Sequence, residues 1–284
     1  PKVENSIYGG TIGGPIVKNR LFYFGSYERF YEERGFQETF AVPTARMRNG
    51  DFSEVLAAFP NFRLYDPLTG DASGAGREIF PGAVIPANRL SPIARRIQDT
   101  YPLPNAGDLN GNRVADDYVI TRAPTFDRHN YDAKVSFNRS SAHQIWGKIS
   151  YLDADVQDRF QIGFDQVAPA PTKVNAPVIG HTWTLSPTLI LDGNFGVTYN
   201  EQSGLSPDYG TNWGTEIWGI PGTNGGDIRQ SGQPQINTGL SAIGNFSSWN
   251  PYFYTTSVYS FSQALTKVAG RHELRAGYDF NKLE

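Results

Sequence analysis

The sequence predicts an all-β fold: an antiparallel transmembrane β-barrel, of which the chain holds about eight strands of a larger barrel, with long extracellular loops. Three observations predict it. Segments of about 10–13 residues alternate apolar with polar side chains, long enough for the tilted spans of about 9–11 residues that a bilayer requires. Short turns alternate with long irregular connections, as at the two ends of such barrels. No run of about 18 apolar residues occurs, which excludes a spanning helix.

Composition fits this fold and excludes several function classes. The chain has 25 basic and 28 acidic residues, so no nucleic-acid partner is expected. Aromatic residues make up 13% of the sequence while the mean hydropathy is −0.43, which suits strands that meet lipid with every second residue. Cysteine is absent, which excludes disulfides, thiol nucleophiles and thiolate metal sites. The first residues lack a signal peptide, so we expect an internal portion of an exported protein.

The expected elements follow one another as four hairpins in a single partial barrel domain covering 1–284. Strands are expected at 6–16, 21–31, 129–138, 143–152, 177–186, 189–200, 254–267 and 271–281. Short turns are expected near 18–20, 139–141, 186–188 and 268–270, and long connections at about 33–126, 156–175 and 201–252.

Strand alternation also predicts which side chains face the barrel lumen. In the segment 129–138, Tyr131 and Val135 share one face, and polar residues occupy the other. A charged side chain on the lipid face costs roughly 2–4 kcal/mol near the membrane midplane, so the charged series is assigned to the interior. A slip of one residue in register would reverse the assignment. The residues predicted to face the lumen are Asp132, Lys134, Gln144, Lys148, Asp192 and Asn194.

The first long connection carries its own local order. Ser91 followed by Pro92 is typical of a helix start, and the apolar residues after it predict a short helix at about 91–99. A connection of this length, without a strand pair of its own, is usually either functional or disordered. The helix and the scattered apolar residues favour a folded extracellular cap.

Aromatic residues gather in the third long connection. Tyr209, Trp213 and Trp218 lie inside it and are candidate ligand contacts, because aromatic faces offer stacking surfaces. A second group, Trp249 and the aromatics of 252–254, adjoins a strand start. We expect it to form part of an interfacial aromatic girdle.

Other site types find little support. The acidic stretch 108–117 resembles a calcium loop, but Arg113 stands where glycine is expected and no glutamate follows at the twelfth position, so a polar turn is preferred over weak calcium binding. The four histidines form no paired metal motif, and no serine nucleophile elbow occurs. We expect no catalytic residues, no cofactor, no metal site and no enzyme activity.

Several motifs occur in the same order as in a known family. They are GGTIGGPIVKNRLFYFGSYE at 9–28, RNGDFS at 48–53, YDPLTG at 65–70, FPGAVIPANRL at 80–90, YPLPN at 101–105 and GRHELRAGYDF at 270–280. The chain resembles the barrel of Oar-like TonB-dependent outer-membrane receptors. The resemblance implies an N-terminal carboxypeptidase-regulatory-like domain, a plug and a barrel of about 22 strands.

The resemblance also implies a function and partners. Extracellular loops would capture a bulky solute, and a TonB-driven rearrangement of the plug would open its path, for import or export. The partners would be outer-membrane lipid, the TonB complex acting through the plug, and the solute. The plug and the TonB box are absent from this sequence, and about a third of the barrel strands are present.

One alternative comes from another class: a secreted or surface β-domain that binds glycans or proteins as an adhesin. It would bury its aromatic faces between two sheets in a soluble, closed core. A β-rich glycan hydrolase is a third possibility, which would need a pair of carboxylates in a cleft.

Overall fold

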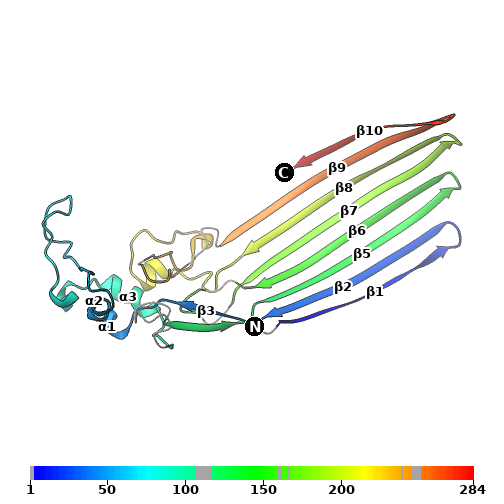
Figure 1. The fold of residues 1–284 in the computed structure, drawn as a ribbon. Coiled ribbons are helices and arrows are strands. Elements are labelled where there is room, and N and C mark those ends of the chain that lie inside the picture. The colour runs from blue at the N-terminus through cyan, green and yellow to red at the C-terminus, as the bar shows by residue number, and fades with distance from the viewer. Residues whose placement is uncertain (1–2, 107–116, 159–160, 165–166, 238, 245–250) are drawn as a thin grey trace.

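The main element is one antiparallel sheet. The computed structural model describes residues 3–106, 117–158, 161–164, 167–237, 239–244 and 251–284. The sheet has eight strands in the order β1-β2-β5-β6-β7-β8-β9-β10 (Figure 1). Its strands are β1 (Val3–Val17), β2 (Leu21–Arg34), β5 (Thr125–Ser140), β6 (His143–Gln157), β7 (Pro169–Ser186), β8 (Leu189–Gly204), β9 (Tyr252–Ala269) and β10 (His272–Leu283). Within the described residues the sheet is open, which confirms the prediction of eight strands of a partial barrel.

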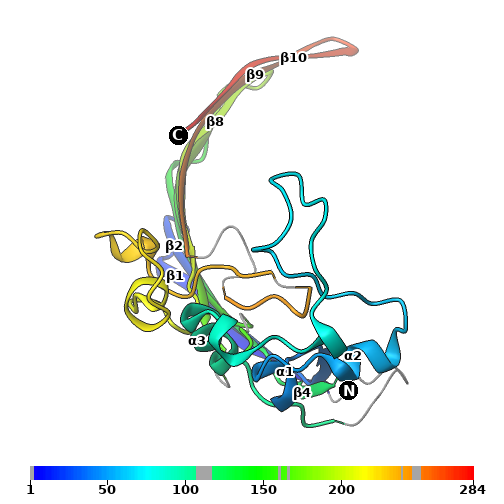
Figure 2. The same cartoon turned by 90° about the vertical axis from the view of Figure 1, so that its left-hand side faces the viewer.

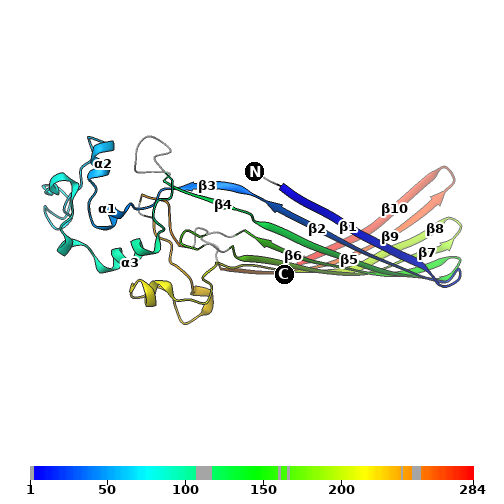
Figure 3. The same ribbon diagram turned by 90° about the horizontal axis from the view of Figure 1, so that it is seen from below.

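The sheet is a single curved layer. Seen from the end of the strands, the sheet forms an arc (Figure 2). The view from below shows that its two ends differ (Figure 3). The tight turns gather at one end, while the long connections and all the helices gather at the other. This is the asymmetry that the sequence predicts.

The four tight turns lie within two residues of their predicted positions. Asn19 between β1 and β2 has a φ of 63°, and Gly270 between β9 and β10 has a φ of 62°. Asparagine and glycine tolerate this left-handed backbone better than other residues. The turn residues therefore match the geometry of short hairpins.

The long connections are shorter than predicted, because the strands extend further. They cover 35–124, 158–168 and 205–251 instead of 33–126, 156–175 and 201–252. The second differs most, since β7 begins at Pro169. Pro169 and Pro171 have no backbone N–H, so the sequence does not predict a strand at these positions. In the structure each of them pairs with a residue of β6.

The described parts of these three connections fold together, and we term them the loop module. Its described helices are α1 (Ala45–Arg48), α2 (Ser53–Ala58), α3 (Pro92–Thr100), η1 (Pro81–Ala83), η2 (Ala87–Arg89), η3 (Trp213–Ile217) and η4 (Ile228–Gln230). Its core contains Val42, Tyr101, Ile162, Trp218 and Ile243, none more than 3% exposed. Residues from all three connections share this core, so the first connection belongs to a folded cap, as expected.

Two local details of the first connection bear on the predictions. Helix α3 follows the predicted helix within one residue, with Ser91 Oγ accepting a hydrogen bond from the Ala94 N–H. The expectation that the connection lacks a strand pair is wrong. Strands β3 (Phe36–Phe40) and β4 (Tyr118–Arg122) pair with each other. They are joined by the whole connection instead of a turn, so no local pattern marks the pair. Among the described residues no helix is long and apolar enough to cross a membrane.

Candidate functional site

The register of the sheet sorts its side chains onto two faces. Asp132 on β5 pairs with Ser150 on β6. Gln144, also on β6, pairs with Thr182 on β7, and Thr182 in turn pairs with Asp192 on β8. Paired residues share a face, and so do residues separated by two along a strand. All six residues predicted to face the lumen therefore lie on one face, which we term the polar face. That this face lines a lumen stays a prediction.

One hydrogen-bonded network crosses three strands of the polar face. Asp132 accepts hydrogen bonds from Ser150 Oγ at 2.6 Å, Lys148 Nζ at 2.9 Å and Ser26 Oγ at 3.3 Å. These residues lie on β6 and β2, on either side of the β5 strand that carries Asp132. The carboxylate thus compensates the lysine charge and bridges its neighbouring strands.

A second network lies toward the other edge of the same face. Arg275 on β10 donates to both carboxylate oxygens of Asp192 on β8, at 2.8 and 3.0 Å, and to Thr266 Oγ1 on β9 at 3.0 Å. This two-pronged geometry is the stronger form of an arginine–carboxylate pair. On the strands β5 and β6 of the first network, Lys134 Nζ lies 5.1 Å from the centroid of the Trp146 ring. Polar contacts therefore recur across the width of the sheet.

The opposite face, which we term the apolar face, presents large apolar side chains that no part of the described chain covers. The clearest examples are 40–63% exposed and come from β5 to β10: Val135, Ile149, Ile179, Phe195, Leu265, Leu274, Tyr278 and Phe280. An exposed apolar surface spread over six strands is far larger than water-soluble proteins tolerate. It is the surface expected in contact with lipid.

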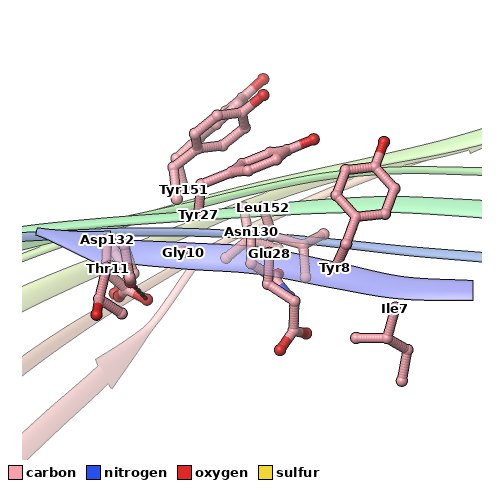
Figure 4. Close-up of a pocket in the computed structure, with 16 residues that line it drawn as sticks. Ile7, Tyr8, Gly10, Thr11, Tyr27, Glu28, Asn130, Asp132, Tyr151 and Leu152 are labelled. Carbon is pink, nitrogen blue, oxygen red and sulfur yellow. Dashed lines mark hydrogen bonds between the residues drawn. The ribbon is translucent and has the colours of Figure 1, made fainter.

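Tyrosines mark the end of the apolar band on the side of the loop module. Tyr27, Tyr131 and Tyr151 are aligned across β2, β5 and β6, with neighbouring ring centroids 5.0 and 6.0 Å apart. Figure 4 shows Tyr8, Tyr27 and Tyr151 on one side of the ribbon and Asp132 and Glu28 on the other, around a hollow of about 710 Å³. Amphipathic rings in this position are typical of a membrane interface.

Charged residues follow the tyrosines immediately toward the loop module. Arg29 pairs with Asp127 through two nitrogens at 2.7 and 2.8 Å, and His129 Nε2 lies 3.3 Å from the same carboxylate. Apolar side chains, then tyrosines, then ion pairs form the sequence expected from hydrocarbon through headgroups to water.

The loop module holds the three aromatic residues predicted to contact a ligand, and one of them needs correction. Trp218 is fully buried, and its Nε1 donates to Thr100 Oγ1 at 2.9 Å. Its ring has no surface to offer a ligand, because it forms the core between the first and third connections. Trp213 packs edge-on against it, with ring centroids 6.4 Å apart, and Tyr209 lies 6.3 Å from the Phe253 ring. Both are partly exposed, so their contact with a ligand stays a prediction.

The same module contains a concave site that the sequence does not predict. An apolar cavity of about 560 Å³ is lined by residues of α1, α2 and α3 and of the third connection. The local signal for it was the cluster of three phenylalanines at 52, 59 and 62, whose convergence on α3 no local pattern reveals.

Metal ligands do not gather in the part of the chain that the structure describes: no three His, Cys, Asp or Glu side chains come together there. The calcium-like stretch at 108–117 lies outside the described residues except for Asp117, and so does Trp249 of the predicted girdle.

The family follows from a comparison with known sequences. Residues 1–284 match the outer membrane beta barrel domain family over their whole length. The chain belongs to this family. It is therefore an outer-membrane protein, as the sequence predicts. The soluble adhesin alternative requires a second sheet over the aromatic faces, whereas no part of the chain that the structure describes covers the apolar face.

No curated protein matches the chain. Among solved structures it is similar to the toluene transporter TbuX of Ralstonia pickettii, with 6% identity and a TM-score of 0.31 over 99% of this chain and 55% of that one. It is also similar to CymD, a monoaromatic hydrocarbon channel, with 10% identity and a TM-score of 0.31 over 99% of this chain and 60% of that one. The chain thus spans less than two thirds of either structure.

Proposed function

We propose that this chain is the barrel portion of a TonB-dependent, Oar-like receptor that moves a bulky solute across the outer membrane. The observation that carries the proposal is the contrast between the two faces of the curved sheet. One face is apolar and bordered by tyrosines, and the other carries charged networks from β2 to β10. A polar inner wall is useful only if something hydrophilic fills or crosses the barrel.

The polar face would form part of that inner wall. Asp132, Lys134, Gln144, Lys148, Asp192 and Asn194 would contact the plug or the passing solute. Because Asp132 and Asp192 are each paired with a basic side chain, much of the charge on this wall is internally compensated. A compensated wall can hold a polar plug without binding it so strongly that it cannot move.

The loop module would supply the capture surface above the membrane. Its core holds the three connections together, so the module presents one folded surface instead of three separate loops. The resemblance to Oar-like receptors supports the remaining steps, in which the TonB complex pulls on the plug and the path opens. Import and export both fit this arrangement.

The proposal is tested in cells by measuring which compounds accumulate in the growth medium and which are removed from it. Three strains are compared with the wild type: one lacking the gene for this protein, one lacking TonB, and one lacking both. For energised transport we expect the same compounds to accumulate in, or vanish from, the medium of both single deletions, with no further change in the double deletion.

Two results would contradict the proposal. A transport defect that adds to that of the TonB deletion would indicate a passive channel, and no change in any compound would remove the transport function. Complementation of the deletion with the double variant Asp192→Asn, Arg275→Gln tests whether the charges of the polar face contribute to transport. The double variant removes both charges together, so neither residue is left as an unpaired ion.

A further inference from the structure

The apolar cavity of the loop module has a closed floor and an open mouth. Its volume is about 560 Å³, within the usual range of about 300–1,000 Å³ for sites that bind small molecules. Met47 and Tyr101 at the floor are each 3% exposed, whereas Phe59 at the mouth is 47% exposed. The cavity can therefore admit a ligand from the water side without unfolding its base.

The walls come from two connections that hydrogen bonds hold together. Helices α1, α2 and α3 belong to the first connection, and Leu240 belongs to the third. Tyr101 Oη donates to the carbonyl of Ser241 at 2.9 Å, next to Leu240. Arg48 donates to the carbonyls of Tyr101 and Pro102 at 2.8 and 2.6 Å, which fixes the end of α3 against α1. Such a preformed cavity spares a ligand the cost of ordering its site.

The lining restricts the chemistry of the ligand. Among the described residues no charged side chain lines the cavity, and its polar side-chain groups are the Gln98 amide and the Tyr101 hydroxyl, which donates to Ser241. Phe52, Phe59 and Phe62 supply aromatic surface. An ion entering such a site would lose its hydration without gaining a counter-charge, which is strongly unfavourable. Apolar surface would gain about 25 cal/mol per Å² removed from water.

We propose that this cavity binds an uncharged, largely apolar moiety with at most one or two hydrogen-bonding groups, and that it captures the bulky transported solute through that moiety. The identity of the cavity as a capture site rests on the proposed transport function. Binding itself does not, so the two are measured separately.

The binding test uses a matched pair of probes and a matched pair of variants. The probes are 1-naphthalenemethanol, which is neutral, and 1-naphthoate, which has the same ring system and a negative charge. The variants are Ala94→Phe, which fills the cavity from α3, and Ala57→Phe on α2, which is not among the lining residues. Both alanines are exposed, so neither substitution burdens the core. Binding is followed by naphthyl fluorescence with the full-length protein in lipid nanodiscs, against empty nanodiscs.

We expect saturable binding of 1-naphthalenemethanol to the wild type and to Ala57→Phe. Binding of 1-naphthoate should be weaker by about tenfold or more, because the cavity offers it no counter-charge. Ala94→Phe should weaken the neutral probe by about tenfold or more, because filled space excludes the ring.

Three results would overturn the site: no saturable binding beyond that of empty nanodiscs, equal binding of the two probes, or equal losses in the two variants. A segment of this chain already occupying the cavity would give the first of these. If binding behaves as expected but deletion of TonB has no effect on transport, the proposed function fails and the site stands. If transport is TonB-dependent and Ala94→Phe transports at the wild-type rate, the capture role fails.

Discussion

The sheet and the loop module solve the same problem, the placement of apolar side chains, in opposite ways. In the sheet, residues such as Phe195 and Ile149 point outward and are almost half exposed. In the loop module, Trp218 and Ile162 are fully buried. Backbone ladders between neighbouring strands hold the sheet together, and its apolar surface is the one expected to face lipid. The module buries its apolar surface within itself, as water-soluble domains do. One chain therefore contains two regions, each adapted to a different solvent.

The largest effect should follow from removing the centre of the module core. Trp218→Ala removes a fully buried ring and its hydrogen bond to Thr100, which should destabilise the module by about 3–5 kcal/mol. Pulse proteolysis in urea measures the loss for the module, and heat-modifiable gel mobility reports on the barrel of the same sample. Trp183→Ala is the control, since Trp183 lies on the apolar face and is 40% exposed. If Trp218→Ala unfolds the barrel together with the module, the two regions are not separable.

The next effect tests the two faces of the sheet on adjacent residues. Phe195→Arg places a charge on the apolar face and should cost roughly 2–4 kcal/mol of folding free energy in lipid, because no counter-charge or water is present there. Asn194→Arg places the same charge on the polar face, one residue away, and should fold like the wild type. The yield of heat-modifiable protein after refolding into vesicles measures both. A reversed order would mean that the faces are assigned the wrong way round, and equal losses would mean that the two faces do not differ in their surroundings.

A smaller effect is expected for the paired charges of the polar face. Arg275→Gln should lower stability by at most about 1 kcal/mol, because the Arg275–Asp192 pair is partly exposed. Denaturation in urea, measured in vesicles, gives the value. A loss several times larger would show that the pair is shielded from water and acts as a structural element of the wall.

The smallest effect concerns the acid response of the module. The Ser53 hydroxyl and N–H, together with Arg46, lower the pKa of Asp51 from 3.8 to about 2. A carboxyl with a lowered pKa stabilises the fold fully above its unfolded value, and this contribution disappears as the pH falls through its folded value. The module should therefore lose this contribution between about pH 4 and pH 2, and Asp51→Asn should flatten that part of the profile. Proteolysis midpoints of both proteins from pH 2 to 5 provide the comparison. An unchanged profile in the variant would exclude Asp51 as the source.

The two regions also differ in how far the sequence alone predicts them. The strands could be predicted because alternation is a local pattern: neighbours such as Tyr131 and Asp132 differ in polarity and lie on opposite faces of one strand. The six polar-face residues fall on one side for the same reason. The largest difference between a predicted and an observed strand boundary is at the start of β7. The alternation is lost there, and Pro169 and Pro171 are residues that seldom occur within strands.

The loop module could be predicted only in its local parts. Helix α3 was found because Ser91 and Pro92 signal its start within two residues. The burial of Trp218 could not be found, because it depends on Thr100, which is 118 residues away in the chain. An exposed aromatic side chain and a buried one look alike in a sequence until the partners that cover it are known. The apolar cavity cannot be predicted from the sequence for the same reason, since its walls come from two connections.

The shared core of the loop module also sets an order of events during biogenesis. Val42 and Tyr101 come from the first connection, Ile162 from the second, and Trp218 and Ile243 from the third. A chain delivered from its N-terminus cannot complete this core until the third connection has arrived, and contacts between such distant residues form slowly. Early hairpins can pair while the module is still open, so its closure reports that all three connections have arrived. Proteases and chaperones that act on exposed apolar surface would therefore distinguish a chain whose connections are still separate from one whose loop module has closed.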